Sequence, residues 1–428
     1  MSIFRKLATD RNNCRVMCDT PGLVSNIMVP ITSDLLHNTP DDHGAWSAVA
    51  MKSLEVMSQF VVAPGEIGAK LRREISSSKE AVSTLQRIFC CNKCNEELQQ
   101  RAIKILTRVH MDSECNRREF VSTLVEVFTQ DTKYSSGIKG YAGCALSEIF
   151  FHGGIGDAKI VIQKGGGEVV DSLTKVLIHE KNKVCRQAAA EILEHLCTHY
   201  TKDDDEYLGK AMTNAMPQIL GEIICWGDET HNGKEADQNG FPKPVTDIES
   251  QSEDNGQDKG NISPSLSHPQ INEHGEDEKE SVTSANSLAS LLSFCGTVYD
   301  MGFISDLPPQ WDTSRFLNKL KETVLSEKEI DRPMVENLLL CKAIGKMVIS
   351  MMKHSGSRFV KQPDLESFIE ALSSASKKMR NIDCYMAFRS TTTSSKLDRR
   401  TLASFVKEAQ EVYAMLPSSC VSGRSPMS

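Results

Sequence analysis

The chain has 428 residues, a net charge of −8 and an aromatic content of only 6%. A negative chain has no general attraction for nucleic-acid phosphates, so a nucleic-acid partner is not expected. The apolar residues are mainly Leu, Ile, Met and Ala, and apolar residues seldom alternate with polar ones as they do in strands. Composition therefore predicts an all-α protein.

Fourteen cysteines are spread along the chain, many of them within helical apolar patterns. No secretory signal is recognisable, so the sequence predicts reduced thiols and a cytoplasmic or nuclear location, with the cytoplasm favoured. No run of about 18 apolar residues occurs, and no spanning helix is expected in this chain.

The first apolar residues, Phe4, Leu7 and Ala8, have helical spacing and are followed by a Pro21-Gly22 turn. This opening is typical of the second half of a helical repeat. Since solenoid ends need capping repeats, the sequence leaves two interpretations open: an upstream segment has been lost through truncation or alternative splicing, or this end is poorly capped. Such a segment would also be the place for a membrane anchor.

A short apolar phrase then recurs along the chain. It reads LVSNI at residues 23–27, AVSTL at 81–85, FVSTL at 120–124, VVDSL at 169–173 and, more loosely, AMPQI at 215–219. The last positions of these phrases are 58, 39, 49 and 46 residues apart. A period in the forties predicts a helical solenoid of the armadillo/HEAT kind. Solenoids bind partners along an extended surface.

Each of the second to fifth phrases follows an amphipathic helix with apolar residues three and four apart. Those helices contain Met51 and Leu54, Ile103 and Leu106, Ala142 and Leu146, and Ala188 and Ile192. Turns between helices are predicted at Pro21-Gly22, at the glycines of residues 165–167 and at the aspartates of residues 203–205, because glycine and capping residues suit helix ends.

The segment CALSEIFFHGGIGDAKIVIQKGGGEVVDSLTKVL, residues 144–177, resembles an armadillo repeat. Together with NCRVMCDTPGLVSNIM at residues 13–28, it is similar to plant armadillo-type superfamily proteins, particularly those of grasses. The resemblance extends over residues 3–227. It implies a right-handed solenoid of helices whose third helix in each repeat lines a concave groove.

The helical pattern stops at residues 228–283, which are rich in Asp, Glu, Gly, Asn and Ser. Residues 233–282 hold twelve acidic and four basic residues, or 4 − 12 = −8, which is the whole net charge. Such a segment buries too little apolar surface to offset chain entropy, so it is predicted to be a disordered acidic insertion.

Helical periodicity resumes over residues 284–416, and 417–428 form a predicted disordered tail. PDLESFI at residues 363–369 repeats the Pro-x-Leu-x-Ser-x-Ile of residues 21–27. We therefore assign residues 332–376 to a sixth repeat and expect a capping helix near residues 397–416. The predicted domains are helical repeats over 1–227, the insertion, and a continuation of the same solenoid.

Several motifs suggest chemistry but have simpler interpretations. The Cys-x-x-Cys of Cys91 and Cys94 lacks the second ligand pair of a zinc site. In the segment from His195 through Cys197 to His199, successive donors are two apart and point about 200° apart on a helix, which favours a helix end. Glycine clusters at 153–156 and 165–167 lack the P-loop pattern. No cofactor, metal or catalytic residue is predicted.

Importin-type armadillo proteins bind basic peptides with a ladder of Trp and Asn. The three tryptophans here lie outside the phrases. The corresponding polar positions, predicted to line the concave groove, are Asn26, Thr84, Thr123 and Ser172. The sequence thus predicts a non-catalytic scaffold that binds an extended peptide or helix of an unidentified protein partner. Two alternatives stay open: a membrane-associated scaffold without its N-terminal anchor, and a ubiquitin-pathway adaptor.

Overall fold

The computed structural model describes residues 2–32, 43–63, 65–111, 117–130, 133–153, 155–199, 206–225, 274–304, 312–325, 334–354, 363–389 and 400–417. Within these ranges the chain forms helices and turns and no strand, which confirms the predicted all-α class.

The N-terminal part contains α1 (Ser2–Ala8), α2 (Arg11–Asp19), α3 (Leu23–Thr32), α5 (His43–Val62), α6 (Glu66–Ser77), α7 (Lys79–Cys90), α8 (Glu96–Met111), α9 (Arg117–Thr129), α10 (Ser136–Gly153), α11 (Ile155–His179), α12 (Lys183–Thr198) and α13 (Glu206–Cys225). The C-terminal part contains α14 (His274–Asp300), α15 (Thr313–Leu325), α17 (Val335–His354), α18 (Pro363–Lys378), α19 (Arg380–Arg389) and α21 (Leu402–Met415).

Local signals fix several helix ends. The Asp10 carboxylate accepts hydrogen bonds from the backbone N–H groups of Asn12 and Asn13 and caps α2. Gly22, in the predicted turn between α2 and α3, has φ +74°, a conformation that side chains other than glycine disfavour. Asn182 caps α12 in the same way as Asp10 caps α2. These ends agree with the turn and capping residues in the sequence.

The helices are arranged in two layers. One layer consists of α5, α8, α10, α12, α14 and α17, each in contact with the next. The other contains α9, α11 and α13, which also contact one another in succession, together with the pairs α3–α7 and α15–α18. All five recurring phrases lie on helices of this second layer, and residues 363–369 lie at the start of α18. The phrase therefore identifies the helices that form the second layer.

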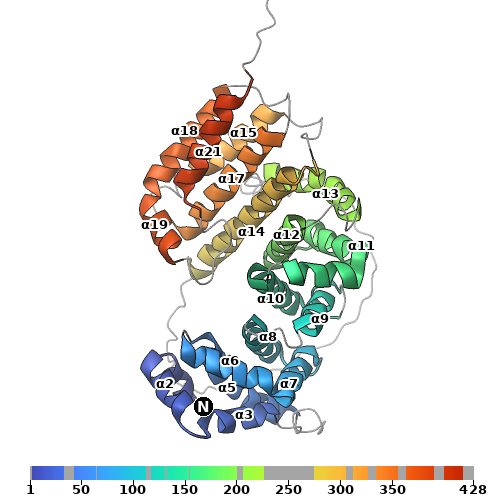
Figure 1. Cartoon of the computed structure of the whole chain (residues 1–428), viewed down its shortest axis with the longest axis vertical. Coiled ribbons are helices and arrows are strands. Elements are labelled where there is room, and N and C mark those ends of the chain that lie inside the picture. Colours follow the sequence, from blue (N-terminus) through green and yellow to red (C-terminus); the bar gives the residue numbers. More distant parts are fainter. Residues whose placement is uncertain are drawn as a thin grey trace, which may run out of the picture.

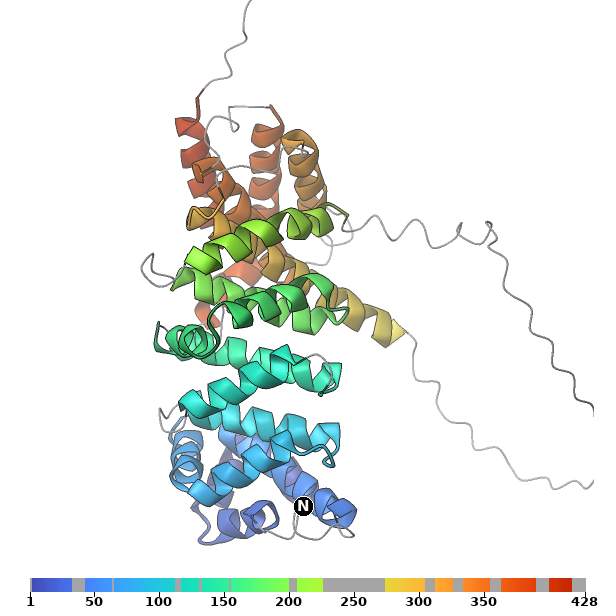
Figure 2. The same ribbon diagram turned by 90° about the vertical axis from the view of Figure 1, so that its right-hand side faces the viewer.

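The stack is bowed (Figure 1). Helices α2 and α19 lie on the left of this view, and α11 lies on the right. Figure 2, seen from that right-hand side, shows α9, α11 and α13 in front. We call α8, α10, α12 and α14 the inner layer and α9, α11 and α13 the outer layer. The sequence placed the phrase helices on a concave face, whereas here they form the outer side of the bend.

A glycine in α10 permits close packing against two neighbouring helices. A Cβ atom built on Gly143 of α10 would lie 2.8 Å from Cβ of Ala188 on α12 and 2.6 Å from Cε2 of Phe128 on α9. One built on Gly140 would lie 3.5 Å from Cγ1 of Val184. At Gly143, α10 therefore approaches both α12 and α9 more closely than a larger side chain permits, whereas the distance at Gly140 is an ordinary van der Waals contact.

The glycines at 165–167 differ from their prediction, because α11 runs through them as one helix. Each helical glycine costs about 1 kcal/mol relative to alanine. Buried residues on both sides of the glycines offset this cost, namely Ala158 and Val161 before them and Val170, Leu173 and Leu177 after them. Tertiary packing here overrides a local turn signal.

Other predicted features lie partly outside the described residues. These include the aspartates at 203–205, most of the acidic insertion (226–273), residues 397–399 of the expected capping helix and the tail from 418. Helix α14 begins at His274, nine residues before the predicted end of the insertion at residue 283. The capping helix is observed as α21, which packs on α17 and α18.

Replacing Gly143 with alanine should destabilise the protein by about 1–3 kcal/mol, because the new methyl group overlaps Ala188 and Phe128. Urea denaturation followed by circular dichroism measures the change. Gly156→Ala is the matched control: nothing lies within 4 Å of its Cβ position, so helix propensity alone should stabilise the protein by at most about 1 kcal/mol. Equal effects of the two substitutions would contradict the close approach of α10 and α12.

Candidate binding groove and the polar junction

A groove lies between α9 and α11, in the outer layer. Its volume is about 190 Å³. The described residues that line it are Val121, Ser122, Val125, Glu126 and Thr129 from α9 and Ile160, Val161 and Val169 from α11. Val121 and Ser122 belong to the third recurring phrase and Val169 begins the fourth, so the groove lies between two copies of the phrase.

The groove is apolar with polar groups beside it. Val125 and Val161 are buried, whereas Ile160 and Val169 are half-buried and accessible from the groove. Glu126 is exposed, and its carboxylate accepts a hydrogen bond from the Gln130 side chain at 3.0 Å. A cavity of about 150 Å³ lined by aliphatic residues accepts a benzene-sized ligand. This groove therefore has room for one large apolar side chain.

The four polar residues predicted to line a groove do not gather in one place. Thr84 is 3% exposed and belongs to the core, which corrects its prediction as a surface residue. Asn26 is exposed on α3. The hydroxyls of Thr123 and Ser172 bond to the carbonyls one turn earlier, those of Glu119 and Glu168. None of the four lines the groove between α9 and α11.

The four predicted residues all occupy the fourth position of the phrase, and the residues that line the groove were not among those predicted. Val121 and Val169 occupy the second and first positions of their phrases, and Val125 follows one turn after Val121. Ile160 lies before the glycines at 165–167, where a turn rather than a continuous helix was predicted. The sequence did contain an indication of the groove: the helices around the phrases have more apolar residues than a single buried face requires.

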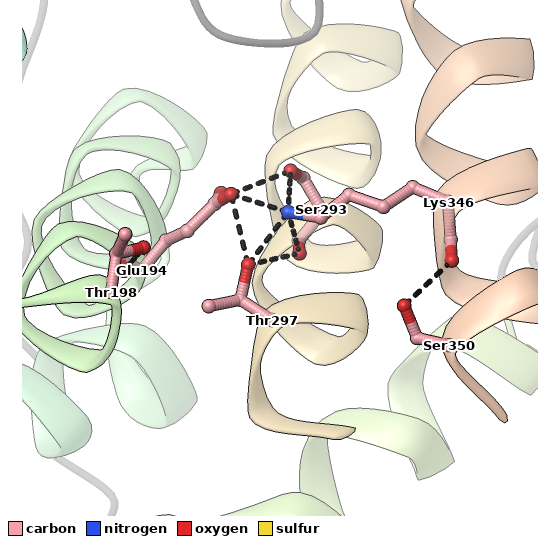
Figure 3. A network of polar contacts seen from close by, with 6 residues as sticks. All are labelled: Glu194, Thr198, Ser293, Thr297, Lys346 and Ser350. Atoms are coloured by element: carbon pink, nitrogen blue, oxygen red, sulfur yellow. Dashed lines mark hydrogen bonds and ion pairs between the residues drawn. The ribbon is translucent and has the colours of Figure 1, made fainter. Parts of the chain in front are cut away.

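A polar network joins α12, α14 and α17 in the inner part of the stack (Figure 3). The Lys346 ammonium lies 2.6 Å from Glu194 Oε1 and 2.6 Å from Thr297 Oγ1, and it also approaches the carbonyl and hydroxyl oxygens of Ser293 at 3.0 and 3.2 Å. The hydroxyls of Ser293 and Thr297 donate to Glu194 Oε1 at 3.0 and 3.1 Å. We call these four residues the polar junction.

The polar junction joins the parts of the chain on either side of residues 226–273. The side chains of Glu194 and Lys346 are each 19% exposed, so water screens their attraction only in part. Nearby, Ser290 donates to Glu191 Oε1 at 3.0 Å, and Ser147 donates to the other oxygen of the same carboxylate. These contacts tie α10, α12 and α14 together and give the inner layer a defined register.

Burial raises the thiol pKa of several cysteines, including two that lie near the polar junction. Burial raises the pKa of the thiols of Cys197 and Cys295, and the Glu194 carboxylate raises both further. Burial likewise raises the pKa of Cys94 to about 12, with a smaller contribution from Cys91. A thiol needs its thiolate form to attack or to bind metal, so these cysteines are unreactive at neutral pH.

The Cys-x-x-Cys lies in the turn between α7 and α8, which the buried Gln99 holds by donating to the carbonyls of Phe89 and Cys91 at 3.1 and 2.7 Å. Among the described residues, no group of three or more His, Cys, Asp or Glu side chains is arranged to hold a metal ion. His195 lies in the last turn of α12, at the predicted helix end.

Neither a comparison with models of protein families nor one with curated proteins finds a match to this chain. None of the helices within the described ranges is long and apolar enough to cross a bilayer.

The polar junction should show strong coupling between Glu194 and Lys346. In a double-mutant cycle of Glu194→Gln and Lys346→Met, followed by urea denaturation, we expect a coupling energy of about 1–3 kcal/mol. The control pair is Lys407–Glu411, which is 79% and 57% exposed and should couple by no more than about 0.5 kcal/mol. Equal coupling in the two pairs would mean that the junction adds no more than a surface ion pair.

Proposed function

We propose that this protein is a non-catalytic interaction scaffold, built as an armadillo/HEAT-like right-handed solenoid of about six irregular repeats. Support for the architecture comes from the recurring phrases, which all occupy one layer of the stack. Support for the function comes from the apolar groove between α9 and α11. The partner is an extended peptide or a helix that runs along the outer layer.

The groove is the observation that carries this proposal. Its walls come from two neighbouring helices of one layer, so the groove runs between units of the stack. Helical and extended partners bind such grooves by inserting apolar side chains at regular intervals. Glu126 stands beside the groove and favours a partner with a basic residue next to its apolar anchor.

Selection of peptides from a random display library on the full chain tests the proposal, with affinities then measured by calorimetry. The variant is Val169→Glu, which places a charge at a half-buried position of the groove. Selected peptides should bind it at least about tenfold more weakly, because an apolar anchor then meets a carboxylate. The variant should remain folded, since Val169 is not fully buried.

Val29→Glu is the matched control. Val29 is 56% exposed on α3, in the same layer but away from the groove. It should leave peptide affinity unchanged. Peptides that bind the Val169→Glu variant as tightly as the native chain would contradict the assignment of the groove, and a selection that yields no specific peptide would contradict the scaffold proposal.

A further inference from the structure

The groove between α9 and α11 has two walls of different chemistry. On α11, every described residue that lines it is apolar, namely Ile160, Val161 and Val169. On α9, the wall includes three polar residues at helical spacing, namely Ser122, Glu126 and Thr129. Residues three, four and seven apart share one face of a helix, so these side chains form a single polar edge along α9. The groove therefore has an apolar side and a polar edge.

The groove follows both helices for about two turns. Its lining runs over residues 121–129 of α9 and 160–169 of α11. At a rise of about 1.5 Å per residue, these spans are about 12 and 14 Å long. A partner segment that lies along the groove is therefore in contact with it over about two helical turns. On a partner helix, apolar residues three or four apart fall within this length.

The lining has few groups for the backbone of an extended peptide. The Thr129 hydroxyl donates to the carbonyl of Val125 at 2.8 Å. The described lining residues include no Asn or Gln, whose amides can donate and accept at once. An extended chain needs a partner for every backbone N–H and C=O that it withdraws from water, whereas a helix pairs these groups internally. A helix is therefore the form that this groove can bury at the lower cost.

The charge on the polar edge also selects the partner. The Glu126 carboxylate is exposed and is hydrogen-bonded to the uncharged side chain of Gln130, so its negative charge is not neutralised by that contact. The ammonium of the nearby Lys133 lies over the ring of Tyr134, 5.1 Å from the centroid. Glu126 can therefore attract a cation of the partner at the α9 side of the groove.

We propose that the groove binds an amphipathic α-helix that carries a basic residue on its α9 side. The apolar stripe of this helix contacts Val125, Val161 and Val169, and a Lys or Arg at the border of the stripe pairs with Glu126. This inference rests on the proposed scaffold function and narrows the partner from an extended peptide or a helix to a helix.

Two displayed peptide libraries of equal length and diversity, selected on the full chain, test the form of the partner. One has fixed alanines that favour a helix, and the other has fixed prolines that prevent one. The best peptides from the alanine library should bind at least about tenfold more tightly than the best from the proline library. They should also bind the Val169→Glu variant at least about tenfold more weakly, which places them in the groove.

The outcomes separate this inference from the scaffold function on which it rests. Proline-library peptides that bind as tightly as the alanine-library peptides, and are weakened by Val169→Glu, would overturn the helix and leave the scaffold function in place. Helical peptides that are indifferent to Val169→Glu would overturn the groove as their site. Selection of no specific peptide from either library would contradict the scaffold function itself.

A charge exchange tests the basic edge. The tightest helical peptide is compared with a version whose basic residues are replaced by glutamate. The native chain should prefer the basic version by about tenfold, and Glu126→Lys should reverse this preference. Glu80→Lys is the matched control, because Glu80 is exposed on α7 and does not line the groove. An unchanged preference in Glu126→Lys, or the same reversal in Glu80→Lys, would overturn the pairing with Glu126.

Discussion

The close approach of α10 to both α12 and α9 at Gly143 constrains how the two layers of the stack pack together. No side chain larger than hydrogen fits between Ala188 and Phe128 at this point. Phe128 of α9 contacts this position, and α9 also supplies one wall of the groove through Val121, Ser122 and Val125. The packing at Gly143 thus supports a wall of the groove through residues that differ from those that line it.

The polar junction connects the helices on the two sides of residues 226–273. The entropic cost of closing a loop grows only slowly with its length. A long insertion there is therefore tolerated if the flanking helices pack together in one defined arrangement. Apolar packing between α12 and α14 supplies attraction but little register. The contacts of Lys346 with Glu194, Ser293 and Thr297 require one relative position of three helices, and this position is defined by directional bonds.

Helix positions, which follow from the periodicity of apolar residues, could be predicted from the sequence. Features that depend on packing between helices distant in sequence could not. The phrase spacing located the helices of one layer, and the Pro-Gly turn at Gly22 was correct because its backbone conformation is local. Thr84 was expected at the surface, but its burial is decided by helices distant in sequence. The glycines at 165–167 are helical because the residues around them are packed.

The inner and outer layers differ in the chemical groups that they expose. In the inner layer, the carboxylates of Glu191 and Glu194 are already occupied by hydroxyl and ammonium donors from α10, α14 and α17. The groove between α9 and α11 offers mainly apolar surface, so a ligand there gains chiefly from desolvation. Burying one aliphatic side chain contributes about 1.5–3 kcal/mol, which is less than even a millimolar complex requires. A partner held by this kind of contact must therefore place several anchors along the stack, which is why the proposed ligand is long.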